Sequence, residues 1–260
     1  MDVGRYLERI GVSRTNRSAD RAFLDELVCA HQFHVPFETI DVYDLHKVPS
    51  LSIDDLFDKV VIRHRGGYCF ELNTLFCALL NDLGFEAWSC PFRISSTGEW
   101  GAVTHRGTIV ALEGKRWYVD VGLGGPMPPF ALDIEGGRRS AFGETYWIEP
   151  ADEGRFLLRR LKHQPGNGES PGSFVESTTG VFDPSPAGDA VFEDANERLS
   201  AGENAPFRRM RQANMRMNGG HRTIAGDVYS ETIDKVKTEW PITDLAATLA
   251  RFGIVVAELG

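Results

Sequence analysis

The sequence predicts an α+β protein in which helices come first, an antiparallel sheet or small barrel follows, and a smaller α/β segment ends the chain. Apolar residues recur with a helical period up to about residue 84 and with a period of two from residue 85 onward. After about residue 195 the pattern is mixed. We therefore expect three domains, at residues 1–84, 85–194 and 195–260.

Four helices are expected in the first third, each from apolar residues that fall on one helical stripe. They cover residues 2–11, 18–31, 52–62 and 69–84. Ser18 fits the N-cap of the second helix, which ends before Pro36. The fourth helix has a broad apolar face, and Gly84 is placed to close it.

The middle third favours β-branched and aromatic residues and is punctuated by glycines, which predicts strands. We expect them within residues 85–95, 104–114, 115–124, 145–150, 155–161 and 173–178. The Pro/Gly/Ser-rich stretch 163–173 predicts a loop. In the last third, Asn218-Gly219 predicts a turn and residues 243–253 a closing helix.

The composition is ordinary for a soluble globular protein, with 42 % hydrophobic and 25 % charged residues. The chain has 28 basic and 37 acidic side chains, a formal net charge of −9. A nucleic-acid or anionic-membrane surface is therefore not expected. Because no signal peptide or apolar run of ~18 residues is present and the cysteines are few and irregularly spaced, we expect a cytoplasmic location. No zinc-ligand spacing occurs, so no metal is expected.

The stretch RHRGGYCFELN (63–73) places Cys69 after two glycines and a tyrosine, at the expected start of an apolar helix. Unpaired N–H groups and the helix dipole favour negative charge there, which suits a nucleophilic thiolate. Gly66 and Gly67 allow a sharp turn and close approach of a substrate, and the first N–H groups can face an oxyanion. The alternative is a core cysteine, as we interpret Cys29, Cys77 and Cys90.

A catalytic thiol needs a base and an orienting group, and His105 with Asp120 fits these roles conditionally. If Glu113 and Gly114 are the central residues of a two-residue turn, Asp120 lies opposite Gly107, on the face of His105 and diagonal to it. Diagonal neighbours are ~7–8 Å apart, within reach of these side chains. A three-residue loop would move Asp120 to the other face, leaving two unrelated surface residues.

Other motifs are weaker. His31 and His34 are spaced i, i+3, but no further ligand accompanies them, so packing is expected. Residues 168–172 match G-x-S-x-G, yet no strand precedes and no helix follows, so we predict a flexible loop. An arginine-rich segment can meet phosphates or form a solvated face; its members are Arg208, Arg209, Arg211, Arg216 and Arg222.

These motifs together resemble the arylamine N-acetyltransferase family. RGGYCFELN, preceded by HVPFETID and followed by THRGTIVALEGKRWYVDVGLGG, is similar to that family's R-G-G-x-C-F/W-E-x-N, Thr-His and D-V-G-F-G elements. The match runs from YLERIG to about Pro129. The resemblance implies a helical bundle, a β-barrel and an α/β lid. It also implies a cysteine-protease-like arrangement of Cys69 as nucleophile, His105 as base and acid, and Asp120 as orienter, buttressed by a Glu38–Arg65 ion pair.

The resemblance further implies N-acetylation of arylamines or arylhydrazines by a ping-pong mechanism through an acetyl-cysteine. Acetyl-CoA is then a donor substrate, and no permanently bound cofactor is expected. Expected CoA contacts are Gly122, Gly124, Gly125 and Phe207, although a lone GxGG is more often a plain turn. Aromatic residues that line an arylamine pocket, or equally belong to the core, are Phe37, Phe70, Phe130 and Phe207. The alternatives are a papain- or transglutaminase-like cysteine hydrolase and a non-catalytic thiol sensor or binding protein.

Three positions depart from the family pattern. Thr39 replaces an asparagine, which should change a structural hydrogen bond. Leu123 replaces a phenylalanine, which trims an apolar wall. Pro206 and Phe207 are kept, but the Ser-Thr pair expected before them is missing, so the resemblance does not define how residues 196–222 meet CoA or the acceptor.

Overall fold

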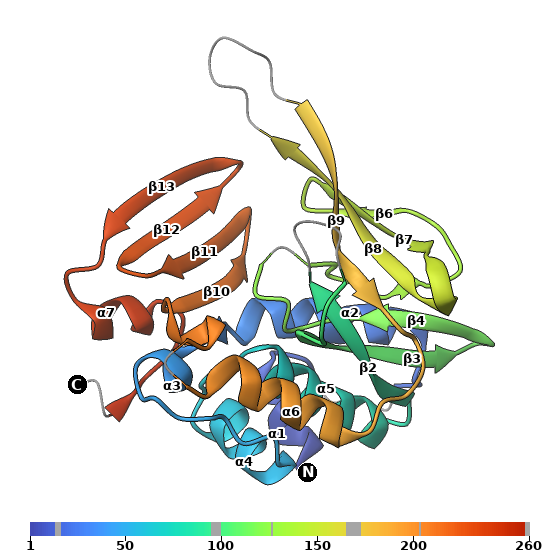
Figure 1. Cartoon of the computed structure of the whole chain (residues 1–260), viewed down its shortest axis with the longest axis horizontal. Helices are drawn as coiled ribbons and strands as arrows, with labels where there is room; N and C mark the ends of the chain where they lie inside the picture. The colour runs from blue at the N-terminus through green and yellow to red at the C-terminus, as the bar shows by residue number, and fades with distance from the viewer. Residues whose placement is uncertain (14–16, 95–99, 126, 165–172, 203, 258–260) are drawn as a thin grey trace.

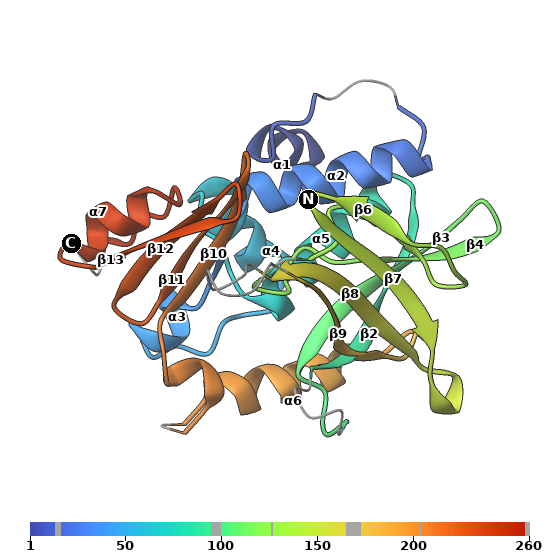
Figure 2. The same cartoon turned by 90° about the horizontal axis from the view of Figure 1, so that it is seen from above.

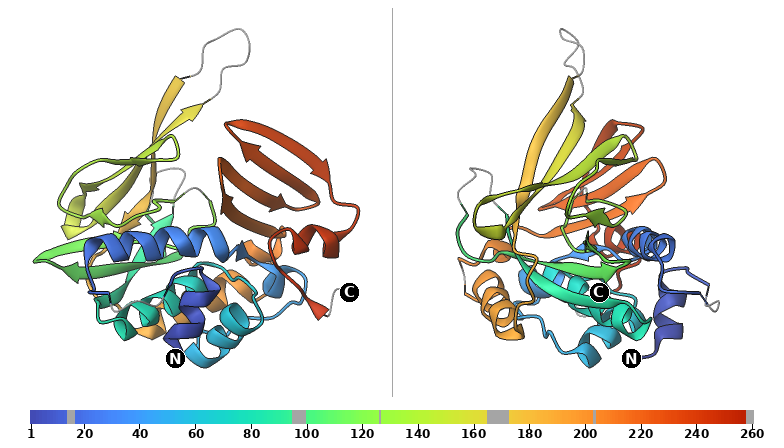
Figure 3. Two further views of the ribbon diagram at one scale, coloured as in Figure 1. Left: turned by 180° about the vertical axis from the view of Figure 1, so that it is seen from behind. Right: turned by 90° about the vertical axis from the view of Figure 1, so that its right-hand side faces the viewer.

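The computed structural model describes residues 1–13, 17–94, 100–125, 127–164, 173–202 and 204–257. It confirms the predicted α+β fold. Two antiparallel sheets, one of eight strands and one of five, lie on a layer of helices (Figure 1). Figure 3 shows the two sheets standing side by side above this layer.

The helical layer has α5 at its centre, with α2 and α6 on opposite sides of it (Figure 2). Its N-terminal elements are α1 (Val3–Arg9), α2 (Arg21–His34), α3 (Ile40–Tyr43), α4 (Ile53–Phe57), the π-helical turn η1 (Asp58–Ile62) and α5 (Cys69–Asp82). The cap predicted at Ser18 is wrong, because the Asp20 carboxylate accepts from the Phe23 N–H at 2.8 Å and starts α2 there. In the described part of the chain, no helix has the length and apolar character needed to span a bilayer.

The eight-stranded sheet curls into a nearly closed barrel, because the edge strand β5 contacts β7, the strand next to the opposite edge. The strand order is β5-β4-β3-β2-β9-β8-β7-β6. The strands are β2 (Glu86–Ile94), β3 (His105–Leu112), β4 (Lys115–Val119), β5 (Leu132–Asp133), β6 (Arg139–Ala141), β7 (Glu144–Pro150), β8 (Phe156–Gln164) and β9 (Ser173–Phe182), with the short helix η2 (Asp152–Gly154) between β7 and β8.

The β3–β4 hairpin has the predicted register. Glu113 and Gly114 are its two turn residues, and both have positive φ, 56° and 73°. Thr108 lies opposite Val119 and Leu112 opposite Lys115. A two-residue turn of this kind matches the twist of the flanking strands, so the condition on which the His105–Asp120 pairing depended is met.

The five-stranded sheet has the order β1-β10-β11-β12-β13 and takes its first strand from the N-terminal third. Its strands are β1 (Phe37–Glu38), β10 (Gln212–Met217), β11 (Gly220–Ala225), β12 (Val228–Ile233) and β13 (Val236–Pro241). The predicted turn at Asn218-Gly219 joins β10 to β11, and α7 (Leu245–Ala250) falls within the predicted closing helix. Helix α6 (Asp189–Ser200), which includes the expected domain limit at 194/195, and η3 (Pro206–Arg208) precede this sheet.

Candidate functional site

Cys69 is the first residue of α5, as predicted, and its side chain is 3 % exposed. The two glycines before it bring the chain against β1. A Cβ on Gly66 would lie 2.0 Å from the Pro36 carbonyl oxygen, and the Gly67 carbonyl accepts from the Glu38 N–H at 2.9 Å. These glycines therefore permit close contact with the protein's own backbone, which fixes where the helix begins.

His105, the first residue of β3, lies beside this helix start and is buried. Its Nε2 is 2.6 Å from Oδ2 of Asp120. Burial disfavours the charged ring, but the negative charges of Asp120 and Cys69 outweigh it and raise the pKa of His105 to about 10. Because Nε2 is committed to Asp120, Nδ1 is the nitrogen left for the Cys69 thiol, which also interacts with the ring.

The Asp120 side chain is fully buried, and each of its carboxylate oxygens accepts two hydrogen bonds. Besides His105, Oδ2 accepts from the Tyr118 hydroxyl at 2.6 Å, and Oδ1 accepts from Asn73 Nδ2 and the Gly122 N–H, both at 2.9 Å. Burial alone would raise the pKa of Asp120, but His105 and these hydrogen bonds lower it. The carboxylate is therefore held charged and in one orientation.

Asn73 links the two halves of the site. It lies one helical turn after Cys69 on α5 and is fully buried. Its Nδ2 also donates to the Arg106 carbonyl at 2.6 Å, and its Oδ1 accepts from the Val121 N–H at 3.1 Å. Sequence reasoning did not assign Asn73 a role, although it is the final residue of the C-F-E-x-N motif.

The glycine segment after β4 contacts the protein itself. A Cβ on Gly122 would lie 2.8 Å from Cys69 Cα and 3.0 Å from Asn73 Nδ2. Gly124 has φ +74°, and its Cβ would meet the Phe37 ring at 2.9 Å, whereas Gly125 has nothing within 4 Å. Gly122 is thus required for packing the segment after β4 against Cys69, a role that sequence reasoning missed.

A buried charge network supports the entry to α5. The implied Glu38–Arg65 ion pair is present at 2.7 Å, and Arg65 also contacts Asp41 at 2.8 Å. Lys59 joins the network through Asp41 at 2.7 Å and Glu71 at 2.6 Å. Burial opposes the charge of Lys59, but the surrounding carboxylates raise its pKa above the usual value. Sequence reasoning missed Lys59, which lies in the π-helical turn.

Glu71 connects that network to the helix start. Its second carboxylate oxygen accepts from the Tyr68 N–H at 3.0 Å. Tyr68 is the N-cap residue of α5, so this bond satisfies one backbone N–H beside the helix N-terminus. The helix start that carries Cys69 is therefore held in place, through Glu71, by its buried ion pair with Lys59.

Three of the four aromatic residues considered for an arylamine pocket pack in one cluster with Cys69, namely Phe37, Phe70 and Phe207. Phe207 makes an edge contact with Tyr68 at 5.0 Å between ring centres. Phe130 instead belongs to the barrel core and packs against Tyr146. Of these four rings, only the first three lie in the cluster that contains Cys69.

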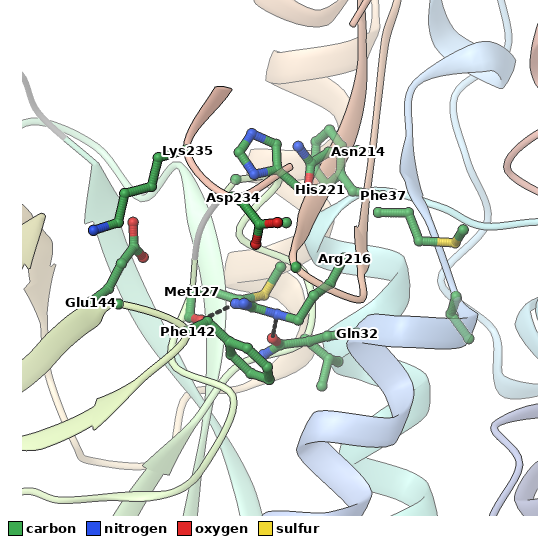
Figure 4. A pocket seen from close by; sticks show the side chains of 17 residues that line it. Gln32, Phe37, Met127, Phe142, Glu144, Asn214, Arg216, His221, Asp234 and Lys235 are labelled. Carbon is green, nitrogen blue, oxygen red and sulfur yellow. Dashed lines mark hydrogen bonds between the residues drawn. The ribbon is translucent and has the colours of Figure 1, made fainter. Parts of the chain in front are cut away.

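A cavity of about 290 Å³ lies between the barrel and the five-stranded sheet and reaches Phe37, Val121 and Gly125 (Figure 4). Arg216 of β10 lines this cavity (Figure 4). Its guanidinium group donates to Gln32 Oε1 at 3.1 Å and to the Met127 carbonyl at 2.8 Å. Gln32 in turn donates to the carbonyls of Asp120 at 3.1 Å and of Pro128 at 2.8 Å. The C-terminal sheet is thereby linked, through Gln32, to the backbone of Asp120.

The arginines of the basic segment engage separate parts of the protein. Arg211 pairs with Asp44, and Arg208 donates to the Ser200 and His46 carbonyls. Arg222 donates to the Arg251 carbonyl and Arg209 to the Asn204 carbonyl. These contacts do not support a joint phosphate-binding patch.

The remaining motifs have structural partners. His31 is buried and its Nε2 contacts the Tyr6 hydroxyl at 3.0 Å, which confirms a packing role. His34 is exposed, and its Nδ1 contacts the Ala30 carbonyl of the same helix at 2.8 Å. Cys77 and Cys90 are buried, and burial raises the pKa of each thiol. Cys29 is only half-buried. The G-x-S-x-G stretch lies outside the described residues.

Two departures from the family pattern have local consequences. Thr39 exchanges hydrogen bonds with the backbone of Gln212 at the start of β10, with its hydroxyl accepting at 3.0 Å. Leu123 is half-buried and packs against the barrel core.

Comparison with known proteins agrees with this geometry. The model of the N-acetyltransferase family matches residues 20–258. Arylamine N-acetyltransferase of Mycolicibacterium smegmatis is 38 % identical over 143 residues, which is 53 % of this chain and 52 % of that protein. The chain thus matches about half the length of this curated relative.

Solved structures match over almost the whole chain. A structure of Mycobacterium smegmatis N-arylamine acetyltransferase has a TM-score of 0.86 at 26 % identity and covers 100 % of this chain and 95 % of its own. Mycobacterium marinum arylamine N-acetyltransferase in complex with CoA has a TM-score of 0.85 at 25 % identity, with the same coverage. The chain therefore belongs to the arylamine N-acetyltransferase family.

Proposed function

We propose that this protein transfers the acetyl group of acetyl-CoA to the nitrogen of an arylamine or arylhydrazine through an acetyl-Cys69 intermediate. The observation that carries the proposal is the convergence of three groups. The thiol lies at the start of α5, the imidazole begins β3, and the carboxylate follows β4, 2.6 Å from the ring. The CoA complex of the M. marinum relative supports acetyl-CoA as the donor.

In the first half-reaction the Cys69 sulfur attacks the thioester carbonyl of acetyl-CoA. His105, which has already taken the thiol proton through Nδ1 to form a thiolate–imidazolium pair, gives that proton to the departing CoA sulfur, while Asp120 orients the ring. The N–H groups of the first turn of α5 stabilise the oxyanion. The carbon–sulfur bond of CoA breaks, and acetyl-Cys69 and free CoA result.

In the second half-reaction the amine attacks acetyl-Cys69, and His105 accepts its proton. Acetylation removes the negative charge of Cys69, one of the two charges that raise the pKa of His105. The ring therefore loses its proton more readily in the acetyl-enzyme, which suits a general base. The amide leaves, and the thiolate–imidazolium pair is restored.

CoA and acceptor must reach the same sulfur in turn. We propose that Gly122, Gly124, Gly125 and Phe207 border the CoA path, since Gly125 lines the cavity and Phe207 packs against the aromatic cluster around Cys69. We propose a cytoplasmic location, because the nucleophile requires a reducing compartment.

Steady-state kinetics with acetyl-CoA and an arylhydrazine such as hydralazine test this function. We expect parallel double-reciprocal lines and one acetylated amine for each CoA released. A cysteine hydrolase would release free acetate in place of the acetylated amine. A thiol sensor would release no CoA, and selective fast alkylation of Cys69 by iodoacetamide would not depend on His105.

A further inference from the structure

Strand β13 is the outer edge of the C-terminal sheet, paired within the described part of the chain only with β12 (Figure 1). All six of its residues are exposed. An edge strand presents free N–H and C=O groups that can pair with another chain. Pro241 at its end is consistent with this place, because proline is tolerated where the missing N–H would face outward.

The turn between β12 and β13 determines which backbone groups face outward. Asp234 and Lys235 are its two central residues, with φ of 49° and 70°, and Ile233 lies opposite Val236. Residues that flank a two-residue turn exchange hydrogen bonds, and the pattern then alternates. Residues 236, 238 and 240 therefore direct their backbone groups toward β12, and Lys237 and Glu239 direct theirs outward.

Two copies of β13 can pair antiparallel about a two-fold axis, with outward residues opposite outward residues. A register centred on Lys237 places two lysines opposite each other, and one centred on Glu239 does the same with two glutamates. A register centred on Thr238 places each Lys237 opposite a Glu239, twice by symmetry. Since like charges directly opposite are unfavourable, the strand is self-complementary in this last register.

The apolar residues of β13 match the same register. Val236 is 68 % exposed and Trp240 is 43 % exposed. Pairing about Thr238 places Val236 of each copy opposite Trp240 of the other, on one face of the joined sheet. Trp240 is already stacked on Tyr229 of β12, with ring centres 5.6 Å apart, so its ring is preorganised for this contact.

We propose that the protein forms a two-fold symmetric dimer by pairing of β13 with β13 of a second copy, which joins the two five-stranded sheets into one. The pairing is short, so the dimer is weak and depends on concentration. It lies outside the triad and is independent of the proposed reaction.

Sedimentation velocity of the full chain from about 10 to 500 μM tests the dimer, since a contact of this size is expected to dissociate in the micromolar range. The wild type should shift toward the dimer as concentration rises. Lys237→Glu or Glu239→Lys alone should raise the dissociation constant about tenfold, because each places like charges opposite twice. The double swap should restore wild-type association.

An equimolar mixture of the two single variants gives the sharpest result. Each chain then carries one sign of charge, so the two should associate with each other although neither self-associates well. Arg5→Glu is the matched control, because it makes the same charge change on exposed α1 and should leave the dimer unchanged. A wild type that stays monomeric at the highest concentration overturns the proposal, as do single variants that dimerise normally or a swap and mixture that fail to restore association.

Discussion

Replacing Gly122 by alanine should displace Cys69 relative to His105, the proposed nucleophile and base. The added Cβ would lie 2.8 Å from Cys69 Cα, at least about 0.6 Å short of ordinary van der Waals contact, which begins near 3.4 Å. The obstructing atom is backbone, so either the start of α5 or the end of β4 must move. Overpacking of this kind costs about 1–3 kcal/mol.

The same displacement should also slow the acetylation of Cys69. Misplacement of reacting groups by about 1 Å can cost ~100-fold in rate, so a shift of this size should slow acetylation of Cys69 about tenfold or more. Stopped-flow measurement of CoA release from acetyl-CoA, without any amine, reports that step alone. The melting temperature shows that the variant is folded.

Gly125→Ala is the matched control. Gly125 belongs to the same glycine segment, but no described atom would lie within 4 Å of its added Cβ and its φ is not positive, so Gly125→Ala should leave Cys69 in place. Because Gly125 is also proposed to border the CoA path, the two variants are compared at saturating acetyl-CoA, where Gly125→Ala should acetylate at the wild-type rate. Normal acetylation by Gly122→Ala would refute the packing argument. An equal loss in both variants would instead indicate that the segment acts through contact with CoA.

Two further predictions concern buried charge. The pKa of His105 is raised from an ordinary value of 6.5 to about 10, so its protonated form stabilises the fold fully below about pH 6.5, and this stability is lost as pH rises through 10. Urea titrations between pH 6.5 and 10 should show that the free energy of unfolding falls more steeply for the wild type than for His105→Gln. If the two proteins lose the same free energy of unfolding over this range, the raised pKa of His105 is contradicted. Lys59→Met should cost about 3–5 kcal/mol of unfolding free energy in urea, because it leaves the buried Glu71 carboxylate without its cation, whereas the partly buried Asp41 keeps Arg65. Lys115→Met, which breaks the pair of a 55 % exposed lysine with Asp133, should cost far less, because solvent screens an exposed ion pair. Equal losses in the two variants would show that the buried network carries no special stability.

Local rules were enough to predict part of this site. The Glu113-Gly114 turn fixes the register of β3 and β4, because a two-residue turn allows one pairing. The apolar period and the preceding glycines place Cys69 at a helix start. Each of these predictions depends on residues that are close together in the sequence.

The missed features depend on contacts between distant segments. Gln32 of α2 reaches the backbone of Asp120, and Arg216 of β10 reaches Gln32. No periodicity links these residues, and a lone glutamine or arginine in a sequence is usually solvated. Strand β1 was missed for the same reason, since two residues acquire a strand conformation only by pairing with β10.

Lys59 shows a third limit. The apolar pattern of residues 52–62 correctly predicted helical structure, but it gave no sign that the backbone becomes π-helical at Asp58. In the folded chain Lys59 is buried among carboxylates, although lysine is almost never buried unless paired. Its partners come from separate helices, so only the folded chain shows that it has them.

Intact-protein mass spectrometry after mixing with acetyl-CoA, in the absence of any amine, tests the central claim most directly. We expect the wild type to gain one acetyl group and to lose it when an arylamine is added, and Cys69→Ala to gain none. Uptake of one acetyl group by Cys69→Ala, or an unmodified wild type, would contradict the assignment of Cys69 as the acetyl carrier.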